Sequence, residues 1–558
     1  MSLFSRSSAP RAAIPLAAAA AVSSIPDPIR AGLAAGWHVK GGPHGELPAS
    51  LTCDVAIVGS GAGAGITAEL LTRAGLQVVI VEEGPLRSSS DFRQIEAEAY
   101  PTLYQESAAR KTVDQAITIL QGRCVGGSTT VNWTTSFRTP IDTLAHWRSH
   151  FGLKDFTEAG MAPWFEQAEQ RLSIAPWLTS PNENNDLLRR GTESLGLENG
   201  SIRRNVKGCW NLGSCGLGCP TNAKQSMLVT TLPAALAGGA TLLVQTRVEQ
   251  LELRGGRVQA LHCVPVQLDG SVAAGGGTRI VAKHVVVAGG AINSPGLLLR
   301  SKAPDPHQRL GARTFLHPVV ISAALMPQPV EGWRGAPQSI YSDHFLHTAA
   351  ADGPMGYKLE VPPLHPVIFS SSLIGFGREQ AESLRQFPNT HSLLALLRDG
   401  FHEQSPGGQV RLRSDGSPEL DYPLTPFVME GARRALLSMA EIQFAAGATQ
   451  VMPVHEMARA AGRWPEARAM IETLPMQPLL TRVVSAHVMG GCGMAGDETR
   501  GVVRPDGLHW QIENLSVHDG SLFPTSIGAN PQLSVYGLAN RLATGLAQRL
   551  GANPVSLA

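Results

Sequence analysis

A glycine-rich turn between two apolar runs, close to the start of the chain, constrains the fold more than any other feature. Residues 55–58 are Val-Ala-Ile-Val, a run typical of a buried parallel strand, and Gly-Ser-Gly-Ala-Gly-Ala follows at 59–64. Gly59 permits the tight turn, Gly61 lets the backbone approach a pyrophosphate, and Ala64 takes the third fingerprint position, where helix and strand pack closely. The pattern predicts a strand–turn–helix unit that binds a dinucleotide.

An acidic residue follows the second apolar run at the spacing that such a unit requires. Residues 78–81 are Val-Val-Ile-Val, and Glu82 comes next, 23 positions after Gly59. The expected gap is about 20 for the carboxylate that binds a ribose diol. The helix between the two runs would direct its free N–H groups and positive dipole end toward the phosphates. An acidic ribose ligand favours FAD or NAD over NADP.

A histidine lies in a glycine-rich segment near the other end of the chain. Residues 485–494 read Ser-Ala-His-Val-Met-Gly-Gly-Cys-Gly-Met, and a second block ends in Asn530-Pro531. Histidine suits proton transfer near neutral pH, and the small residues after His487 allow a planar ring to approach. The Asn530 amide can orient a hydroxyl group. His487 and Asn530 are therefore the predicted catalytic pair of a redox enzyme built around a flavin.

Two further blocks lie between these ends. Residues 122–132 read Gly-Arg-Cys-Val-Gly-Gly-Ser-Thr-Thr-Val-Asn, and residues 288–301 read Ala-Gly-Gly-Ala-Ile-Asn-Ser-Pro-Gly-Leu-Leu-Leu-Arg-Ser. With the first and last segments they resemble the glucose–methanol–choline (GMC) family of FAD-dependent oxidoreductases, with Lys302 as a departure from the usual glycine. The resemblance implies an α/β fold: a discontinuous Rossmann-type FAD-binding domain and an α+β substrate domain with an antiparallel sheet.

The resemblance also assigns the cofactor contacts, position by position. It implies that the residues holding the ADP half of FAD are Gly59, Gly61, Ala64, Glu82 and, through its backbone, Val248. It implies that the residues around the flavin ring are Gly127, Ser128, Asn132, Pro531 and Gln532, with Asp519 near the pyrophosphate. Some members attach FAD covalently through a histidine in or near the segment equivalent to 122–132. That segment contains no histidine here, so noncovalent FAD is expected.

The last block narrows the expected reaction. Asn530 stands where the sugar and methanol branches often carry a second histidine, and it resembles instead the sterol and long-chain alcohol branches. The expected function is oxidation of an alcohol, hydrophobic or long-chain, to an aldehyde or ketone, by hydride transfer to flavin N5 with His487 as base. The alternatives are a sugar or polyol dehydrogenase that passes electrons through an iron–sulfur cluster to a cytochrome, and a non-catalytic flavin-binding relative. The sequence leaves oxygen, a quinone and a cytochrome open as electron acceptors.

Other titratable residues have less specific surroundings. Glu360 is expected to be a solvated carboxylate, with a role as an extra base as the alternative. His284, His509 and His518 are interpreted as structural.

Three of the seven cysteines crowd into one segment, at Cys209, Cys215 and Cys219. Iron–sulfur clusters use cysteine thiolates, but these spacings match neither ferredoxin pattern. The Cys-Gly-Leu-Gly-Cys sequence resembles the long-chain alcohol oxidases. Tetrahedral zinc needs a fourth ligand, and none is adjacent. Structural thiols or one disulfide are the main expectation, with an iron–sulfur cluster and zinc as alternatives, so no metal site is predicted.

Length and charge set the remaining bounds. A chain of 558 residues is too long to fold around one hydrophobic core, so two or more domains are expected. Lys and Arg number 46 against 45 for Asp and Glu, which gives no basic excess for nucleic acid. No apolar run reaches the roughly 18 residues of a membrane span. The expected parts are an N-terminal arm at 1–49, FAD-binding segments at 50–140, 225–310 and 485–558, an inserted lid and cysteine-containing region at 141–224, and a substrate domain at 311–484.

The N-terminal segment carries an ambiguous signal. Arg6 and Arg11 precede an apolar stretch at 12–22 that resembles a poor signal peptide, whereas Pro15 within it favours a simple arm. A cytoplasmic location is favoured, with a periplasmic or membrane-associated one as the alternative. Apolar runs and caps predict further strands at 242–245, 284–288, 319–325, 409–413, 419–422 and 515–518, and helices at 27–36 and 426–446.

Overall fold

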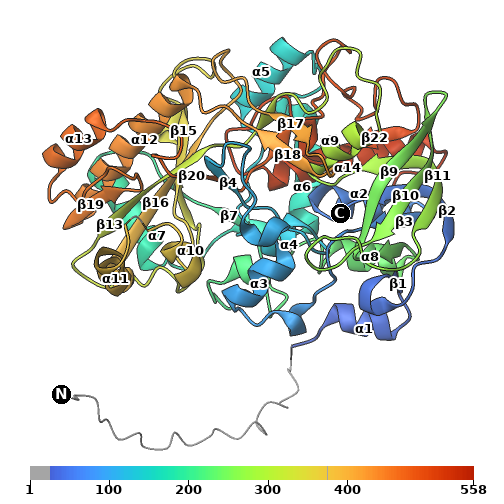
Figure 1. Cartoon of the computed structure of the whole chain (residues 1–558), viewed down its shortest axis with the longest axis horizontal. Coiled ribbons are helices and arrows are strands. Elements are labelled where there is room, and N and C mark those ends of the chain that lie inside the picture. Colours follow the sequence, from blue (N-terminus) through green and yellow to red (C-terminus); the bar gives the residue numbers. More distant parts are fainter. Residues whose placement is uncertain (1–24, 374) are drawn as a thin grey trace, which may run out of the picture.

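The computed structural model describes residues 25–373 and 375–558, which build two large sheets with separate hydrophobic cores (Figure 1). The signal-like stretch at 12–22 lies outside the described residues. The described chain begins with α1 (Pro28–Ala34), whose cap Asp27 accepts a hydrogen bond from the Arg30 N–H at 3.0 Å. This is the N-capped helix that the sequence predicts.

The first sheet carries the dinucleotide fingerprint. Its order is β1 (His38–Lys40), β8 (Thr241–Leu243), β3 (Val78–Val81), β2 (Ser50–Val58), β11 (Thr278–Val287), β10 (Arg257–Pro265) and β9 (Thr246–Arg254), with β22 (Leu515–Val517) also on β11. Five neighbouring strands run parallel, namely β1, β8, β3, β2 and β11, and β22 is parallel to β11. Strands β10 and β9 form an antiparallel extension of the sheet. Strands from the front, middle and end of the chain thus share one sheet, and the predicted discontinuous Rossmann-type fold is confirmed.

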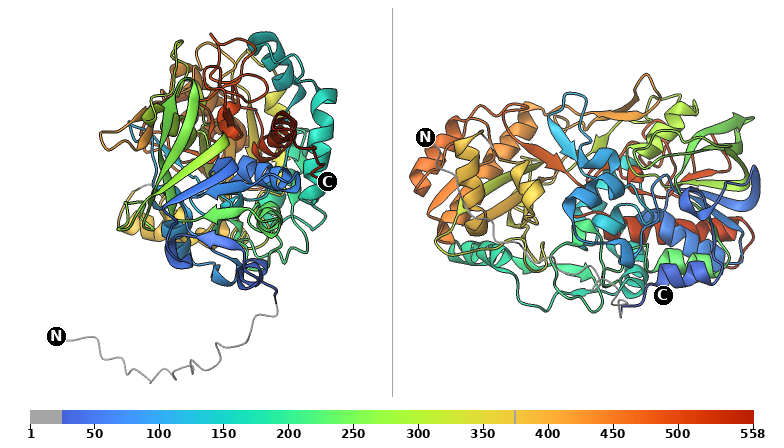
Figure 2. Two further views of the ribbon diagram at one scale, coloured as in Figure 1. Left: turned by 90° about the vertical axis from the view of Figure 1, so that its right-hand side faces the viewer. Right: turned by 60° about the horizontal axis from the view of Figure 1, so that its bottom comes forward.

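Helices cover this sheet. The fingerprint helix α2 (Ala62–Arg73) is buried along most of its length and packs against both α8 (Thr231–Ala237) and the C-terminal α14 (Gln532–Arg549). Figure 2 shows α14, in red, beside α2, in blue. On its other side α14 packs against α6 (Glu158–Arg171). The helix that follows Asn530 and Pro531 is therefore fixed by contacts to the fingerprint helix.

The second sheet is mostly antiparallel. Its order is β4 (Ile117–Ile119), β20 (Val483–Ser485), β13 (Val319–Leu325), β16 (Thr390–Leu397), β15 (Tyr357–Glu360), β14 (Ile340–Ser342) and β6 (Gly200–Ser201), with β19 (Gln450–Pro453) also on β13. Helix α12 (Pro426–Ala445) covers it and buries a stripe that includes Met429, Leu436 and Met439. The predicted α+β domain with an antiparallel sheet is confirmed, as are the strand at 319–325 and the helix from 426.

The region between residues 141 and 224 does not form a body of its own. It holds α5 (Ile141–Phe151), α6, α7 (Glu183–Ser194), β6 and the short pair β5 (Ile174–Pro176) and β7 (Arg203–Asn205). Helix α6 packs on the first unit, whereas α7 packs on α12 of the second. None of the helices in residues 25–373 and 375–558 combines the length and apolar character needed to cross a bilayer.

Candidate active site

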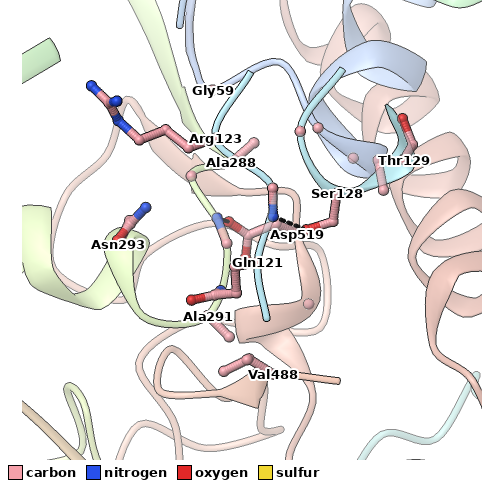
Figure 3. Close-up of a pocket in the computed structure, with 18 of the residues that line it drawn as sticks. Gly59, Gln121, Arg123, Ser128, Thr129, Ala288, Ala291, Asn293, Val488 and Asp519 are labelled. Atoms are coloured by element: carbon pink, nitrogen blue, oxygen red, sulfur yellow. Dashed lines mark hydrogen bonds between the residues drawn. The ribbon is translucent and has the colours of Figure 1, made fainter. Parts of the chain in front are cut away.

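A cavity of about 260 Å³ lies at the carboxyl ends of β2, β3 and β11. This is the edge at which open α/β sheets bind ligands. Figure 3 shows Gly59, Ala288, Ser128 and Asp519 around it, on segments far apart in the sequence. The predicted residues that line the cavity are Gly59, Gly61, Glu82, Gly127, Ser128, Asn132, Val248, His487, Asp519, Asn530, Pro531 and Gln532.

The fingerprint turn needs glycine for two different reasons. Gly59 has φ of +98°, and a Cβ there would lie 2.4 Å from the Ala288 carbonyl oxygen. A Cβ on Gly63 would lie 1.5 Å from the His518 carbonyl oxygen, so this glycine is needed for close packing between α2 and the segment after β22. Ala64 is fully buried inside α2 and does not line the cavity. Its predicted packing role is thus shared with Gly63, which the sequence did not single out for this purpose.

Gly61 and Gly127 form a cradle that side chains would fill. Among the described residues, a Cβ on Gly61 would have only the Gly127 Cα within 4 Å, at 3.9 Å, so it would project into the cavity. A Cβ on Gly127, where φ is +53°, would lie 2.8 Å from the Gly61 Cα. Helix α2 begins at this point, with Gly61 as its N-cap residue. The cradle therefore fits a pyrophosphate at a helix N-terminus, as FAD requires.

Glu82 provides a buried carboxylate on the same wall. Its two oxygens accept hydrogen bonds from the Ser60 hydroxyl at 2.6 Å and from the Gly84 N–H at 2.7 Å. Burial raises the pKa of Glu82 to about 7, against the opposing effect of these hydrogen bonds. The carboxylate stands at the end of β3, where the sequence predicts the ribose ligand, and its chemistry fits a diol donor.

Asp519 organises the loop after β11. Its Oδ2 accepts from the Ser294 hydroxyl at 2.5 Å and from the Gly290 N–H at 2.8 Å, while Oδ1 accepts from the Ser521 N–H at 2.8 Å. The Asp519 side chain thus links the 288–294 loop, which is part of the sequence block at 288–301, to the C-terminal segment. Asp519 lines the cavity, and its position near the pyrophosphate stays a prediction.

The segment at 122–132 is fastened to the rest of the molecule by two residues. Gln532 accepts from the Asn132 amide at 2.6 Å and donates to the Thr135 carbonyl oxygen at 2.8 Å. The buried Lys224 Nζ donates to the carbonyl oxygens of Thr130, Asn132 and Cys215 at 2.6, 2.9 and 2.7 Å. These bonds link the segment to α14 on one side and to the cysteine-rich loop on the other.

The cysteine-rich loop contains three of the seven cysteines of the chain, Cys209, Cys215 and Cys219. Its thiols are free, as are the other four in the chain, and the Cys215 sulfur accepts a hydrogen bond from Arg204 at 3.8 Å. Within the described residues, no group of three or more His, Cys, Asp and Glu side chains is arranged to hold a metal ion. Burial raises the pKa of the Cys209 thiol, with smaller contributions from Cys215 and Cys219, so the three thiols lie near one another. Their role as structural thiols stays a prediction.

Three polar side chains meet beside the cavity: His487 and Asn530 line it, and Glu360, which does not line it, contacts Asn530. His487, just after β20, has its Nε2 3.4 Å from the Asn530 Nδ2. The same Asn530 Nδ2 donates to Glu360 Oε2 at 3.1 Å, and Gln338 Nε2 donates to that oxygen at 2.9 Å. Glu360 Oε1 and Asn530 Oδ1 are buried and have no hydrogen-bond partner in the described part of the chain. The expectation that Glu360 is a solvated carboxylate is wrong: the residue is 0% exposed.

A second histidine fixes the protonation of the first. His317 is 1% exposed, and its Nε2 accepts from the Gly528 N–H at 2.9 Å. Burial lowers the pKa of His317 far below its usual value and that of His487 to about 4, so both rings are neutral. His317 must then carry its proton on Nδ1, which lies 3.3 Å from the His487 Nδ1. His487 accepts there and carries its own proton on Nε2. Its 3.4 Å approach to the Asn530 Nδ2 is therefore a contact between two donors and not a hydrogen bond, and both residues line the cavity.

The backbone of His317 is itself anchored. Its φ is +44°, and its N–H donates to Asp399 at 3.1 Å. Asp399 also accepts from the Leu316 N–H at 3.0 Å and the Tyr422 hydroxyl at 2.6 Å. The sequence offered no motif for His317, Asp399 or Tyr422, because they come from three separate segments. By contrast, His284 bonds Ser516, His518 bonds Thr67, and neither lines the cavity, in agreement with their structural interpretation.

Comparison with known proteins matches most of the chain to one family, the GMC oxidoreductases. The N-terminal model of the GMC oxidoreductases matches residues 100–319, and their C-terminal model matches residues 404–539. An uncharacterised GMC-type oxidoreductase of Mycobacterium tuberculosis is 32% identical over 502 residues, which cover 89% of this chain and 76% of the relative. A long-chain-alcohol oxidase of Arabidopsis thaliana is 27% identical, over 89% of this chain and 68% of the relative.

Solved structures support the fold. The crystal structure of pyridoxine 4-oxidase from Mesorbium loti has a TM-score of 0.65 at 20% identity, over 89% of this chain and 99% of that one. A formate oxidase variant from Aspergillus oryzae RIB40 has a TM-score of 0.64 at 14% identity, over 90% and 99% of the two chains. At these identities the likeness establishes the architecture of two joined units.

Proposed function

The chain belongs to the GMC oxidoreductase family, and from this premise we propose that it oxidises an alcohol to an aldehyde or ketone with noncovalently bound FAD. The observation that carries the proposal is one cavity with two chemically different ends. The fingerprint cradle and Glu82 lie at one end, and His487 and Asn530 lie at the other. Such an arrangement holds a dinucleotide and presents a substrate oxygen to its ring within one cavity.

We propose a hydrophobic or long-chain alcohol as the substrate class. The lining of the cavity includes the apolar side chains of Leu120, Val131, Trp133 and Val488, the last of which follows His487 in the chain. Relatives named long-chain-alcohol oxidases share 26–28% of their residues with this chain over at least 88% of its length. The pocket chemistry and these names point to the same class of substrate.

When bound, FAD supplies the acceptor for the hydride that leaves the alcohol carbon. The protein must hold the alcohol oxygen and remove its proton. The Asn530 amide gives one N–H to Glu360, and its nitrogen lies 3.4 Å from His487 Nε2. The second Asn530 N–H and His487 Nε2–H are thus neighbouring donors beside the cavity, and in this proposal both stabilise a substrate oxygen on which negative charge develops. This assigns His487 a hydrogen-bonding role and revises the sequence-based prediction that it is the base.

Glu360 is then the proposed proton acceptor, directly or through one water. Its Oε2 is held by Gln338 and Asn530, and Oε1 is left to take a proton. Burial raises the pKa of Glu360, so the carboxyl group titrates closer to neutral pH than a solvated one. The rate should fall as pH decreases through this pKa, because the protonated carboxyl cannot accept the alcohol proton.

The proposal is tested with an alcohol panel of increasing chain length, assayed in parallel with oxygen, a quinone and a dye as acceptors. We expect turnover of hydrophobic alcohols, and a Glu360→Gln variant that retains FAD but reduces it about 10²–10⁴ times more slowly. The comparison of acceptors separates an oxidase from a dehydrogenase. Preferential turnover of sugars or polyols would contradict the substrate class, and wild-type rates in Glu360→Gln would contradict its role as base.

A further inference from the structure

A buried lysine lies on the same strand as Glu360. Lys358 is 2% exposed, and its Nζ is 3.7 Å from the ring centroids of both Phe137 and Tyr341. The two rings meet edge to face, at 4.8 Å and 79°. Among the described residues, the carboxylate in an ion pair with Lys358 is that of Asp343, at 4.0 Å. An ammonium group thus sits between two aromatic faces in the interior of the protein.

Burial of the Lys358 ammonium group destabilises the folded protein, which suggests that the charge is retained for a function. The attraction of aromatic faces for a cation is smaller than the free energy that desolvation of an ion costs. Burial accordingly lowers the pKa of Lys358, and the carboxylates of Glu360 and Asp343 oppose this by favouring the charged form. A leucine or methionine would pack between the rings without that cost.

Lys358 and Glu360 are two residues apart on β15, so their side chains leave the same face of the sheet. The other titratable groups around Glu360 come from neighbouring elements. They are Tyr341 on β14, Asp343 after it, His487 after β20 and His317 before β13. Both histidines are neutral, which leaves Lys358 as the cation on the Glu360 strand that acts on its carboxylate.

We propose that Lys358 is a positioning residue that keeps Glu360 ionised inside the apolar site, so that Glu360 can receive the alcohol proton. This inference rests on the role of Glu360 in the proposed function. The aromatic cage explains how the charge acts: the rings hold the ammonium without neutralising it, and within the described chain no ion-paired carboxylate closer than 4.0 Å quenches it. In the proton step, the alcohol O–H bond breaks and a Glu360 O–H bond forms, while Lys358 keeps its protons.

The test is the pH profile of a charge-removing variant. Lys358→Met keeps an unbranched stem between the rings and removes the charge. Without the cation, the pKa of Glu360 rises, and the acidic limb of kcat/KM moves to higher pH. We expect the rate near pH 6 to fall about tenfold or more and to recover as pH increases, because raising a pKa by one lowers the ionised fraction about tenfold at a pH below it. Lys358→Arg, which retains the charge, should keep the acidic limb close to its wild-type position.

A second readout does not depend on turnover. Infrared absorption of the protonated carboxyl group, taken as the difference between Lys358→Met and Lys358→Met/Glu360→Gln, should persist to higher pH than the same difference between wild type and Glu360→Gln. The double variant should also turn over no more slowly than Glu360→Gln alone, because both changes act through one carboxylate.

The outcomes distinguish the two proposals. An unshifted acidic limb and infrared signal in a folded Lys358→Met protein would overturn the role of Lys358 and leave Glu360 as base. Wild-type rates in Glu360→Gln would overturn the proposed proton acceptor itself. If Lys358→Met does not fold, the same titration on Lys358→Gln decides the matter, and a profile like that of Lys358→Arg would count against the proposal.

Discussion

At the scale of single residues, the position of one proton on His487 is decided by a contact two side chains away. The Gly528 N–H occupies Nε2 of His317, and the neutral His317 then donates from Nδ1 to His487. His487 is left with a donor toward the cavity, next to the donor amide of Asn530. In the proposed mechanism the two groups act together on one oxygen, and this makes their effects interdependent.

The expected result for His487→Ala is retained FAD and a flavin reduction rate about 10²–10³ times lower, the usual effect of losing one donor to a developing oxyanion. Asn530→Ala should cost less, and the double variant should lose less than the product of the two single losses, since both donors serve one oxygen. Anaerobic stopped-flow reduction by a hydrophobic alcohol measures this. Multiplicative losses would show that the two residues act at different atoms.

At the scale of elements, the turn between β2 and α2 combines a requirement of folding with one of binding. Gly59 and Gly63 have backbone carbonyls where a Cβ would stand, so they are needed for the fold. Gly61 instead faces open space opposite Gly127, so a side chain there would occupy the cradle while the backbone remains unstrained.

Gly61→Val should therefore bind FAD about 10–100 times more weakly, the equivalent of about 1–3 kcal/mol of crowding, in a protein that still folds. Gly276→Val is the matched control, because a Cβ at Gly276 meets none of the described residues within 4 Å. Titration of the apoprotein with FAD, followed by flavin fluorescence, measures both. Equal affinities in the two variants would exclude the cradle as the pyrophosphate site.

The cysteine-rich loop is an element that is linked to the segment at 122–132 through Lys224. A Cys215→Ser/Cys219→Ser variant should lower the melting temperature and leave flavin reduction by substrate close to wild type. Iron analysis of the wild-type protein is the companion measurement. A content of about three or four iron atoms per chain would identify a cluster and reopen the alternative of a sugar dehydrogenase.

At the scale of the whole molecule, the cavity lies where the two sheets meet. Gly59, Glu82 and Ala288 reach it from the first sheet, and Val488 and Gln338 reach it from segments beside the second. Each sheet has its own hydrophobic core, so a ligand in the cavity joins two otherwise separately stabilised parts.

Removal of FAD should accordingly destabilise the whole chain. At a free FAD concentration about one hundred times Kd, binding adds about 2.7 kcal/mol to the free energy of unfolding. Thermal unfolding of apoprotein and holoprotein, followed by far-UV circular dichroism, should show a melting temperature several degrees lower without FAD and restored by its addition. A melting temperature indifferent to FAD would contradict the assignment of the cavity.

Elements with local signals could be predicted from the order of residues alone. The strand–turn–helix at residues 55–73, the strand at 319–325 and the helix from 426 all follow from apolar periodicity, caps and glycine positions within a few residues. The four motif blocks likewise named His487, Asn530 and the cradle glycines, since a binding turn depends on short-range backbone geometry.

The burial and the neighbours of Glu360, by contrast, depend on contacts between distant segments and could not be predicted from a local pattern. Strand β15 alternates Tyr-Lys-Leu-Glu, a pattern that indicates one solvated face, yet all four residues are buried. Sheet neighbours and the Asn530 segment cover the polar face, and these partners lie up to 170 positions away. The pairing of Glu360 with Lys358, and of His487 with His317, depends on such long-range packing, because burial and the identity of neighbours, rather than residue type, determine where a proton resides.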